Sequence, residues 1–474
     1  MSSLSQSPMR FQSINPADGS LLAEYSPQTH SEVEQALLQM QGAFEEWKRR
    51  PVAERAELIR RLGAVLQSSS APLAQLATRE MGKPILQARA EVEKCAGLCR
   101  HYAEHGPSAL EPQQVQGNAA DRSVIRFDPL GAVLAVMPWN FPYWQVLRFA
   151  VPTLLAGNVA LLKHASNVLG CAAEIQTMFR SAGFPEGIFT SLRVDRTTLP
   201  SLIGHASIRA VTLTGSEAAG MAVAQAAGNH LKKCVLELGG SDPFIVLPDA
   251  DLPRTISQAV QARIMNNGQS CIAAKRFIVH RDCYSSFLDG LTQAFRKLRV
   301  GDPLEEGTEL GPLAREDLRE TLHQQVQASL KQGARLLTGG RPLDRPGWYY
   351  EPTVLADVGP EMTAFQEETF GPVAAVTSVD HADEAVELAN QSSFGLGASI
   401  WTRDIAAAER MAGQIESGSV FINDFTRSDA TLPFGGVKHS GYGRELSHFG
   451  LQEFVNIKTV WINEQSQSPF DSSP

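Results

Sequence analysis

Hydrophobic residues in the first hundred positions recur with a helical period. Residues 31–47 place their apolar side chains on one helical face, and Ser31 and Glu34 have the spacing of a capping box. Three more amphipathic stretches follow, near 52–69, 71–81 and 84–105. This pattern predicts a group of helices that packs against the rest of the chain.

From about residue 122 the period changes, and short, continuously apolar segments alternate with helical ones. The expected strands of the first series are 132–137, 159–164, 188–193, 210–215 and 234–238, with helices near 143–156, 168–182 and 216–229 between them. The alternation restarts at 243–247 and continues to 419–423. Such strands are typical of a parallel sheet covered on both faces. We therefore predict an α/β fold with two doubly wound parallel-sheet domains in series.

Composition supports an ordinary globular enzyme. The chain has 474 residues, of which 43% are hydrophobic and 20% are charged, and a chain of this length is expected to form two or three domains. The net charge is −9, with both signs interspersed, so nucleic acid is not an expected partner. We expect neither a signal peptide nor a membrane span, because the N-terminus is polar and no run of about 18 apolar residues occurs.

Six cysteines are scattered along the chain, too few and too far apart for a disulfide framework. Cys95 and Cys99 share a helix face, but no second pair of ligands lies nearby, so helix packing is favoured over a metal site. No metal is expected, and a reducing cytoplasm is the expected location. There, a free thiol could act as a nucleophile.

Cys271 is the thiol with the most suggestive surroundings. It follows a Gly-Gln-Ser turn in the segment NNGQSCIAAKR (266–276) and precedes a β-rich segment at 275–280. This placement predicts a loop between a helix and a strand, where a side chain can face a cleft. A lone cysteine is more often a small buried hydrophobe, so its interpretation depends on the other motifs.

Two further polar residues end apolar strands. Glu237 lies in VLELGG (235–240), where a buried carboxylate is costly unless it is paired or used; a raised pKa would suit a general base, and a structural ion pair is the alternative. Asn140 lies in VMPWNFPYW (136–144), where two prolines fix the backbone. A rigid amide is suited to binding an oxyanion, and an aromatic packing loop is the alternative.

A possible phosphate site and an acidic pair complete the candidate chemistry. Gly215 and Ser216 form a turn between a strand and a helix, whose first N–H groups favour a phosphate; the spacing is not GxGxxG, and a plain turn is equally compatible. Glu367 and Glu368 precede Phe370, and adjacent carboxylates are more often a solvated turn.

In their order and spacing these motifs resemble the aldehyde dehydrogenase superfamily, from about residue 10 to 463. The matching positions are Asn140, Lys163, Gly215-Ser216, Glu237-Leu238-Gly239-Gly240, Gly268-Gln269-Ser270-Cys271, Glu368-Thr369-Phe370-Gly371-Pro372 and Pro433-Phe434-Gly435-Gly436. The resemblance implies that Cys271 attacks an aldehyde, that the Asn140 amide and the Cys271 N–H bind the oxyanion, and that Glu237 activates the water that hydrolyses the thioester. The acylating, coenzyme A-dependent branch is disfavoured, because its members typically lack the glutamate at 237.

The resemblance also implies a nicotinamide cofactor, NADP or NAD. The implied cofactor-binding residues are Pro138, Trp139, Lys163, Ser166, Gly215, Ser216, Leu238, Glu368 and Phe370. Lys163 and Glu368 would hold the two riboses. Ser166 stands where strictly NAD-linked relatives often have a glutamate that would repel a 2′-phosphate, so we expect NADP to be accepted.

Within the superfamily the chain looks most similar to short bacterial succinate-semialdehyde dehydrogenases. This implies an anionic aldehyde whose carboxylate is bound by Arg148 and Ser428; Arg427 is a further candidate from its position on the same loop. Two alternatives stay open. One is another ω-carboxylated aldehyde such as glutarate semialdehyde, and the other is a non-catalytic binding or structural relative.

The segments 110–129 and 446–463 lie outside the two series of alternating strands and helices. We expect them to form a small β oligomerisation flap, because exposed edge strands tend to be paired. We expect a homodimer or homotetramer. The expected division of the chain is 1–109 and 130–239 for a dinucleotide-binding domain, 240–440 for a catalytic domain, and 110–129 and 446–463 for the oligomerisation segments.

Overall fold

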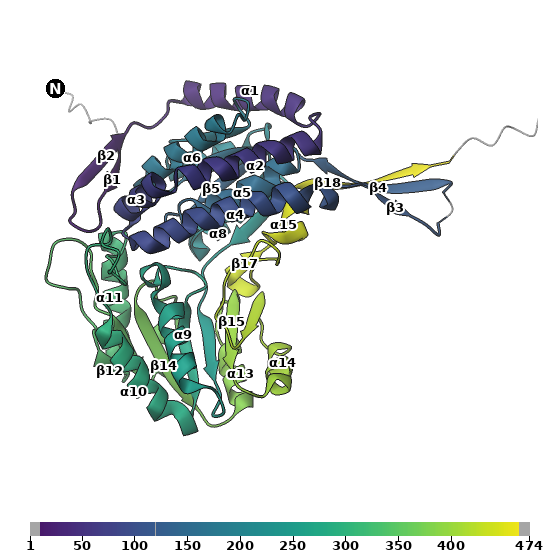
Figure 1. The fold of residues 1–474 in the computed structure, drawn as a ribbon. Coiled ribbons are helices and arrows are strands. Elements are labelled where there is room, and N and C mark those ends of the chain that lie inside the picture. The colour runs from purple at the N-terminus through teal and green to yellow at the C-terminus, as the bar shows by residue number, and fades with distance from the viewer. Residues whose placement is uncertain (1–9, 119, 464–474) are drawn as a thin grey trace, which may run out of the picture.

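The computed structural model describes residues 10–118 and 120–463. Most of the N-terminus on which the signal-peptide expectation rests lies outside this range. Two α/β layers lie one above the other, and an arm projects to one side (Figure 1). Within the described residues no helix is both long and apolar enough to cross a membrane.

The upper layer is built on a six-stranded sheet with the order β17-β9-β8-β5-β6-β7. Its strands are β5 (Ala132–Met137), β6 (Val159–His164), β7 (Phe189–Leu192), β8 (Ile208–Thr214), β9 (Lys233–Glu237) and β17 (Gly441–Tyr442). All neighbours are parallel except β17, which pairs antiparallel to β9. The strand order reverses direction between β5 and β8. In such sheets ligands bind beyond the carboxyl ends of the strands at this reversal.

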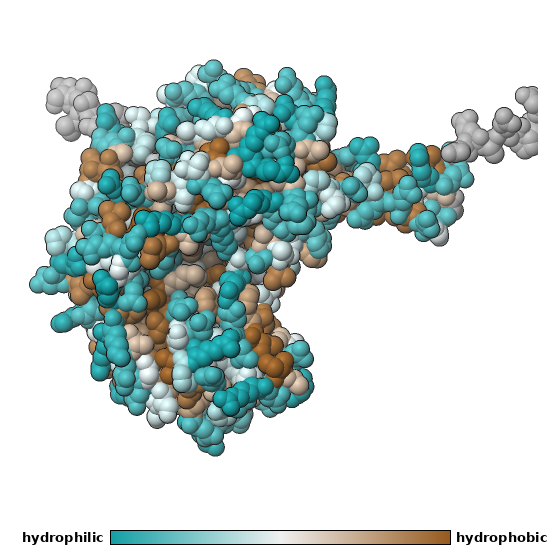
Figure 2. Space-filling model, viewed as in Figure 1, coloured by the Kyte–Doolittle hydropathy of each residue, from teal (hydrophilic) through white to brown (hydrophobic). Residues whose placement is uncertain are grey.

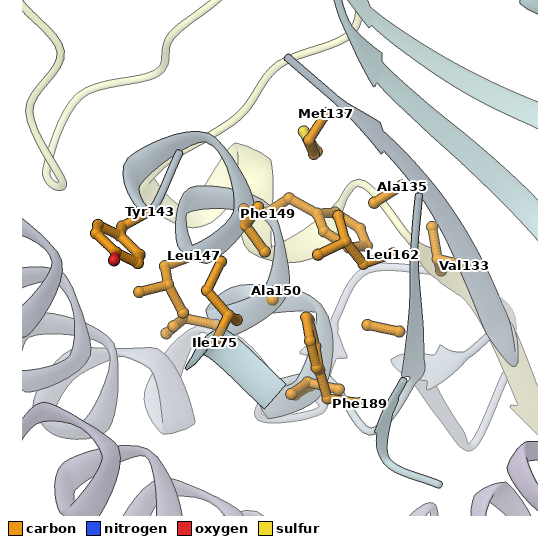
Figure 3. Packing of buried hydrophobic residues seen from close by; sticks show 14 of the residues in the cluster. Val133, Ala135, Met137, Tyr143, Leu147, Phe149, Ala150, Leu162, Ile175 and Phe189 are labelled. Carbon is orange, nitrogen blue, oxygen red and sulfur yellow. The ribbon is translucent and has the colours of Figure 1, made fainter. Parts of the chain in front are cut away.

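Helices cover both faces of this sheet (Figure 1). They are α1 (His30–Trp47), α2 (Val52–Ser68), α3 (Ser70–Met81), α4 (Ile85–Ala109), α5 (Trp144–Leu155), α6 (Leu169–Ser181), α7 (Leu199–Gly204) and α8 (Glu217–Gly228). All residues of α5 are buried, because α5 is apolar on nearly every side and is packed between the sheet and other helices. Figure 3 shows Leu147 and Phe149 of α5 among side chains of β5 and β6.

The lower layer is a seven-stranded sheet with the order β12-β13-β14-β11-β10-β15-β16. Its strands are β10 (Asp242–Val246), β11 (Ala274–His280), β12 (Arg335–Thr338), β13 (Thr353–Ala356), β14 (Val373–Val379), β15 (Gly397–Trp401) and β16 (Ser419–Ile422). Its helices are α9 (Leu252–Ile264), α10 (Arg281–Lys297), α11 (Glu316–Lys331), α12 (Thr363–Gln366), α13 (Ala382–Asn390) and α14 (Ile405–Ala412).

The arm is a three-stranded antiparallel sheet with the order β18-β4-β3. Its strands are β3 (Gln113–Val115), β4 (Arg122–Pro129) and β18 (Val455–Ile462), and α15 (Ser447–Gln452) leads into β18. β18 is an edge strand, and its residues Ile457 and Trp461 are 63% and 52% exposed. Hydrophobic surface is visible along the arm (Figure 2). A hairpin of β1 (Phe11–Ile14) and β2 (Leu21–Tyr25) lies near the N-terminus.

The predicted α/β class with two parallel sheets is confirmed, with four differences in detail. β12 and β17 run antiparallel to their neighbours. β13 and α11 were not predicted from the sequence. β13 is buried and largely apolar, but it has only four residues and directly follows a proline, so its pattern is short. α11 buries only four side chains, two of them polar, so it lacks a strong hydrophobic period.

The loop before β11 has an unusual backbone. Asn266, Asn267 and Gly268 all adopt the left-handed conformation, with φ of 57°, 58° and 73°. A Cβ atom at Gly268 would lie 2.4 Å from the carbonyl carbon and oxygen of Gly371. This loop therefore requires glycine at 268 for both its conformation and its packing.

We expect Gly268→Ala to destabilise the protein by roughly 1–3 kcal/mol and to lower activity, because the left-handed backbone is strained and Gly371 must move. Gly42→Ala in α1 is the matched control: its new Cβ would meet nothing within 4 Å, and alanine favours a helix. Thermal unfolding midpoints of both variants provide the measurement. A midpoint for Gly268→Ala at or above the wild-type value would contradict this account.

Candidate active site

Cys271 lies on the loop predicted from the sequence, between the short turn at Met265–Gly268 and β11. Buried cations hold the backbone of this loop. Lys275 Nζ donates to the carbonyl oxygens of Ser270 and Cys271, at 2.9 Å each. Arg263 donates to the carbonyl oxygens of Gly268 and Ala274, at 3.1 Å each. These bonds turn the loop carbonyls towards the interior and leave the Cys271 side chain half-buried at the cleft.

Asn140 is tied directly to this loop. It follows β5, and its Nδ2 donates to the Gln269 carbonyl at 3.1 Å, while Asn266 Nδ2 donates to the Asn140 carbonyl at 2.8 Å. The other N–H of the Asn140 amide has no acceptor among the described residues. The Cys271 N–H has no acceptor in the described part of the chain. Two donors are thus available beside the thiol, as an oxyanion site requires.

Glu237 ends β9 and is buried. Neither of its carboxylate oxygens has a hydrogen-bond partner among residues 10–118 and 120–463. Burial, and then the charge of Glu445, raise the pKa of Glu237 well above its usual range, while Arg148 opposes the shift. A carboxyl group of this kind can accept a proton near neutral pH.

The pKa of Cys271 is raised to about 12, chiefly by burial. Arg148 and Lys275 oppose this shift, and the carboxylates of Glu368 and Glu237 add to it. The thiol is therefore neutral in the resting protein. Cys271 and Glu237 are also close enough for the charge of one to act on the other.

The residues expected to bind the cofactor follow the strands of the six-stranded sheet. Pro138 and Trp139 follow β5, Lys163 ends β6, Ser166 starts the next turn, and Gly215 and Ser216 follow β8. Because β5, β6 and β8 are parallel, these ends meet at one edge of the sheet.

Local contacts at this edge fit a dinucleotide. Ser216 caps α8 by accepting from the Ala219 N–H at 3.4 Å, which places a helix N-terminus at the strand reversal. Lys163 is half-buried; burial lowers its pKa, and Asp195 opposes the shift. Ser166 is exposed.

The other expected cofactor residues approach from both layers. Phe370 packs edge-on against Trp139, with ring centroids 5.8 Å apart. Glu368 accepts from the Gly240 N–H at 3.0 Å and lies 3.5 Å from Lys275. Leu238 is buried. The aromatic pair and the carboxylate thus span the boundary between the two layers.

A cavity of about 210 Å³ opens beside the thiol. It is lined by residues of α4 and α5, by the Cys271 loop and by the segment around Ser428. Arg148, Arg427 and Ser428 all line it together with Cys271, so the expected substrate residues and the nucleophile share one cavity.

Each of the two arginines of the cavity is paired with a carboxylate. Arg148 is buried, forms an ion pair with Glu445, and lies over the Phe434 ring at 4.6 Å from its centroid. Arg427 is half-exposed and pairs with Asp424. Both arginines therefore already have a carboxylate partner.

Several residues of the site were not recognised from the sequence. Lys275 stands at the start of an apolar strand, where a buried cation is a usable signal. Glu445 follows the glycine-rich segment 432–443 without any local pattern. Lys94 is one of several charged residues on an amphipathic helix, and only its fold neighbours distinguish it from a solvated lysine.

Residues 4–460 match the aldehyde dehydrogenase family. A succinate semialdehyde dehydrogenase of Escherichia coli, named for NAD(P)+, is 53% identical over 451 residues, covering 95% of this chain and 97% of its own. A succinate-semialdehyde dehydrogenase of Mycobacterium tuberculosis, named for NADP+, is 48% identical over 456 residues, covering 96% of this chain and 100% of its own. The solved succinic semialdehyde dehydrogenase of Streptococcus pyogenes, in complex with NADP+, has a TM-score of 0.94 and 34% identity, covering 96% of this chain and 100% of its own. The resemblance predicted from the sequence is confirmed: this chain belongs to the aldehyde dehydrogenase family.

Proposed function

We propose that this protein oxidises succinate semialdehyde to succinate with NADP or NAD. The observation that carries the proposal is the cavity with Cys271 on its wall and three cationic side chains, Lys94, Arg148 and Arg427, around it. An aldehyde that also bears a carboxylate matches both features. The names of the two sequence relatives and of the solved structure support the same substrate.

The Cys271 thiol first loses its proton to solvent, and the first chemical step is attack of the resulting thiolate on the aldehyde carbon. A carbon–sulfur bond forms, and the carbonyl oxygen becomes an oxyanion between the Asn140 amide and the Cys271 N–H. Removing one such donor typically costs about 3–4 kcal/mol of transition-state stabilisation. The chemistry that NADP or NAD supplies when bound is acceptance of the hydride from the same carbon, which leaves a thioester on Cys271.

Hydrolysis of the thioester needs a base, and Glu237 is the proposed one. Glu237 takes a proton from water, the resulting hydroxide attacks the thioester carbon, and the carbon–sulfur bond breaks to release the acid and Cys271. Because the pKa of Glu237 is raised, this role is present above that pKa and is lost as the pH falls through it.

We assign the cofactor to the domain formed by residues 1–109 and 130–239, and the nucleophile to the domain formed by 240–440. We also propose a homodimer or homotetramer that uses the segments 110–129 and 446–463. The exposed edge of β18, with Ile457 and Trp461, supports this assignment. A cytoplasmic location is proposed because the six cysteines are all free and the nucleophile must stay reduced.

Alkylation of Cys271 by iodoacetamide should be slow at pH 7 and should rise about tenfold per pH unit up to pH 9. The reason is that the pKa of the thiol is raised to about 12, so the reactive thiolate fraction increases with pH throughout this range. Mass spectrometry of the Cys271 peptide measures the rate, and Cys271→Ala identifies the signal. A plateau below pH 8 would show that the thiolate is stabilised in the free protein.

Succinate semialdehyde should be oxidised with a higher kcat/KM than uncharged butanal of the same chain length. Glutarate semialdehyde should be poorer by about 10- to 200-fold, the range that one methylene provides. Formation of reduced cofactor is the measurement, and Cys271→Ala should abolish it. Equal values for butanal would contradict the proposed substrate, and a higher value for glutarate semialdehyde would replace it.

NADP should be used at least as well as NAD, because Ser166 carries no charge that repels a 2′-phosphate. Ser166→Glu should lower kcat/KM for NADP by about tenfold or more and change the NAD value less, since like charges repel. Ser166→Gln is the control of similar size without the charge. A strong NAD preference of the wild-type enzyme would refute the role of Ser166.

A further inference from the structure

Lys94 lines the cavity and has no carboxylate partner within residues 10–118 and 120–463. Its Nζ donates to Ser428 Oγ at 2.7 Å and lies 4.2 Å from the centroid of the Trp144 ring. Among the residues that the structure describes, no carboxylate oxygen lies within 4.0 Å of this ammonium group. Arg148 and Arg427, by contrast, are paired with Glu445 and Asp424.

Other charged groups near Lys94 already have partners. Glu91 on the same helix pairs with Lys83 and accepts from the Tyr143 N–H at 2.8 Å. Asp429, on the segment opposite, accepts from the Thr431 N–H at 2.8 Å and from its hydroxyl at 2.7 Å. Neither carboxylate is therefore free to approach Lys94 without losing its own bonds.

The geometry of Lys94 and Ser428 matches a carboxylate. Because Ser428 Oγ accepts from Lys94, its own O–H is free to donate elsewhere. The ammonium group keeps two further N–H donors. The two side chains thus present donors on atoms 2.7 Å apart, close enough to serve both oxygens of one carboxylate. Both line the same cavity as Cys271.

We propose that Lys94, together with Ser428, binds the substrate carboxylate and determines the preference for anionic aldehydes. This inference rests on the proposed function and deepens it. Arg148 does not bind the substrate carboxylate directly in this proposal. It is committed to Glu445 and acts on the substrate only through its positive field, whereas Lys94 makes the direct bond.

The ionisation of Lys94 makes the preference dependent on pH. Burial within the cleft, and then repulsion by Arg148, lower the pKa of Lys94 to about 8, although the side chain stays open to solvent on one side. The ammonium form that attracts a carboxylate is present below this pKa. As the pH rises through it, the preference should decline.

The test compares succinate semialdehyde with butanal in wild-type protein, Lys94→Met and Lys94→Arg. The ratio of the two kcat/KM values cancels the ionisation of Cys271 and Glu237, which both substrates share. Lys94→Met should lower kcat/KM for the semialdehyde by about 10- to 100-fold, mainly by raising KM, and should change the butanal value less than about threefold. Lys94→Arg should retain most of the preference, since it keeps the charge.

The matched control is Lys331→Met on α11, which removes an exposed lysine outside the cavity. It should leave both substrates unchanged. The wild-type ratio should fall between pH 7 and 9.5, and in Lys94→Met it should be flat over the same range. This pH profile distinguishes a Lys94 ammonium group that binds the substrate carboxylate from a Lys94 side chain that only supports the structure.

The outcomes separate this inference from the function on which it rests. If wild-type protein prefers the semialdehyde and Lys94→Met keeps that preference, Lys94 is not the carboxylate ligand and the proposed function stands. If wild-type protein shows no preference, the proposed function itself fails. Should Lys94→Met not fold, a wild-type ratio that stays constant from pH 7 to 9.5 would overturn the inference without any variant.

Discussion

Buried cations that donate hydrogen bonds to backbone carbonyls determine the shape of the active-site loop. Lys275 and Arg263 are both fully buried, and burial lowers the pKa of each. A buried cation is costly unless it is hydrogen-bonded or paired. Of the donor atoms of these two cations, only Nε of Arg263 lacks a partner among the described residues, while Lys275 also lies 3.5 Å from the carboxylate of Glu368. Here the acceptors are carbonyls of the loop itself, together with those of Thr369 and Gly371. The loop cannot relax without leaving a buried charge unsatisfied, so the thiol is held in one place.

This arrangement connects the two layers of the molecule. Asn140, from the six-stranded sheet, donates to the loop that precedes β11 of the seven-stranded sheet. Asn267 on that loop donates to the Gly82 carbonyl at the end of α3, at 2.8 Å. Glu368 accepts from Gly240, where the chain passes from one sheet to the other. The nucleophile and its oxyanion donors therefore form a site only while the two layers stay packed.

Much of the fold and the chemical centre could be predicted from the sequence, because they leave local patterns. Continuous apolar strands predicted the two sheets. Glu237 was recognised because a charged residue at the end of an apolar strand is unusual. Lys94 and Glu445 could not be found in this way. Lys94 lies on an amphipathic helix where lysine is ordinary, and Glu445 pairs with Arg148 across 297 positions of the chain, a contact that only the tertiary structure creates. β13 escaped prediction because its buried run is only four residues long and directly follows a proline, and α11 escaped because only two of its side chains are both apolar and buried.

Charge balance explains why the cavity favours an anion although the protein as a whole is negative. The net charge of −9 would repel an anionic aldehyde at long range, but salt screens such a field beyond about 8–10 Å. Within the cavity the local balance is different. Arg148 is offset by Glu445 and Arg427 by Asp424, and this leaves the ammonium group of Lys94 as a positive charge without a paired carboxylate in the described structure. One cation without a directly paired carboxylate, beside a serine hydroxyl, is therefore enough to bind a small carboxylate. The more distant charges of Asp429 and Glu91 oppose the repulsion by Arg148 that favours the neutral form of Lys94.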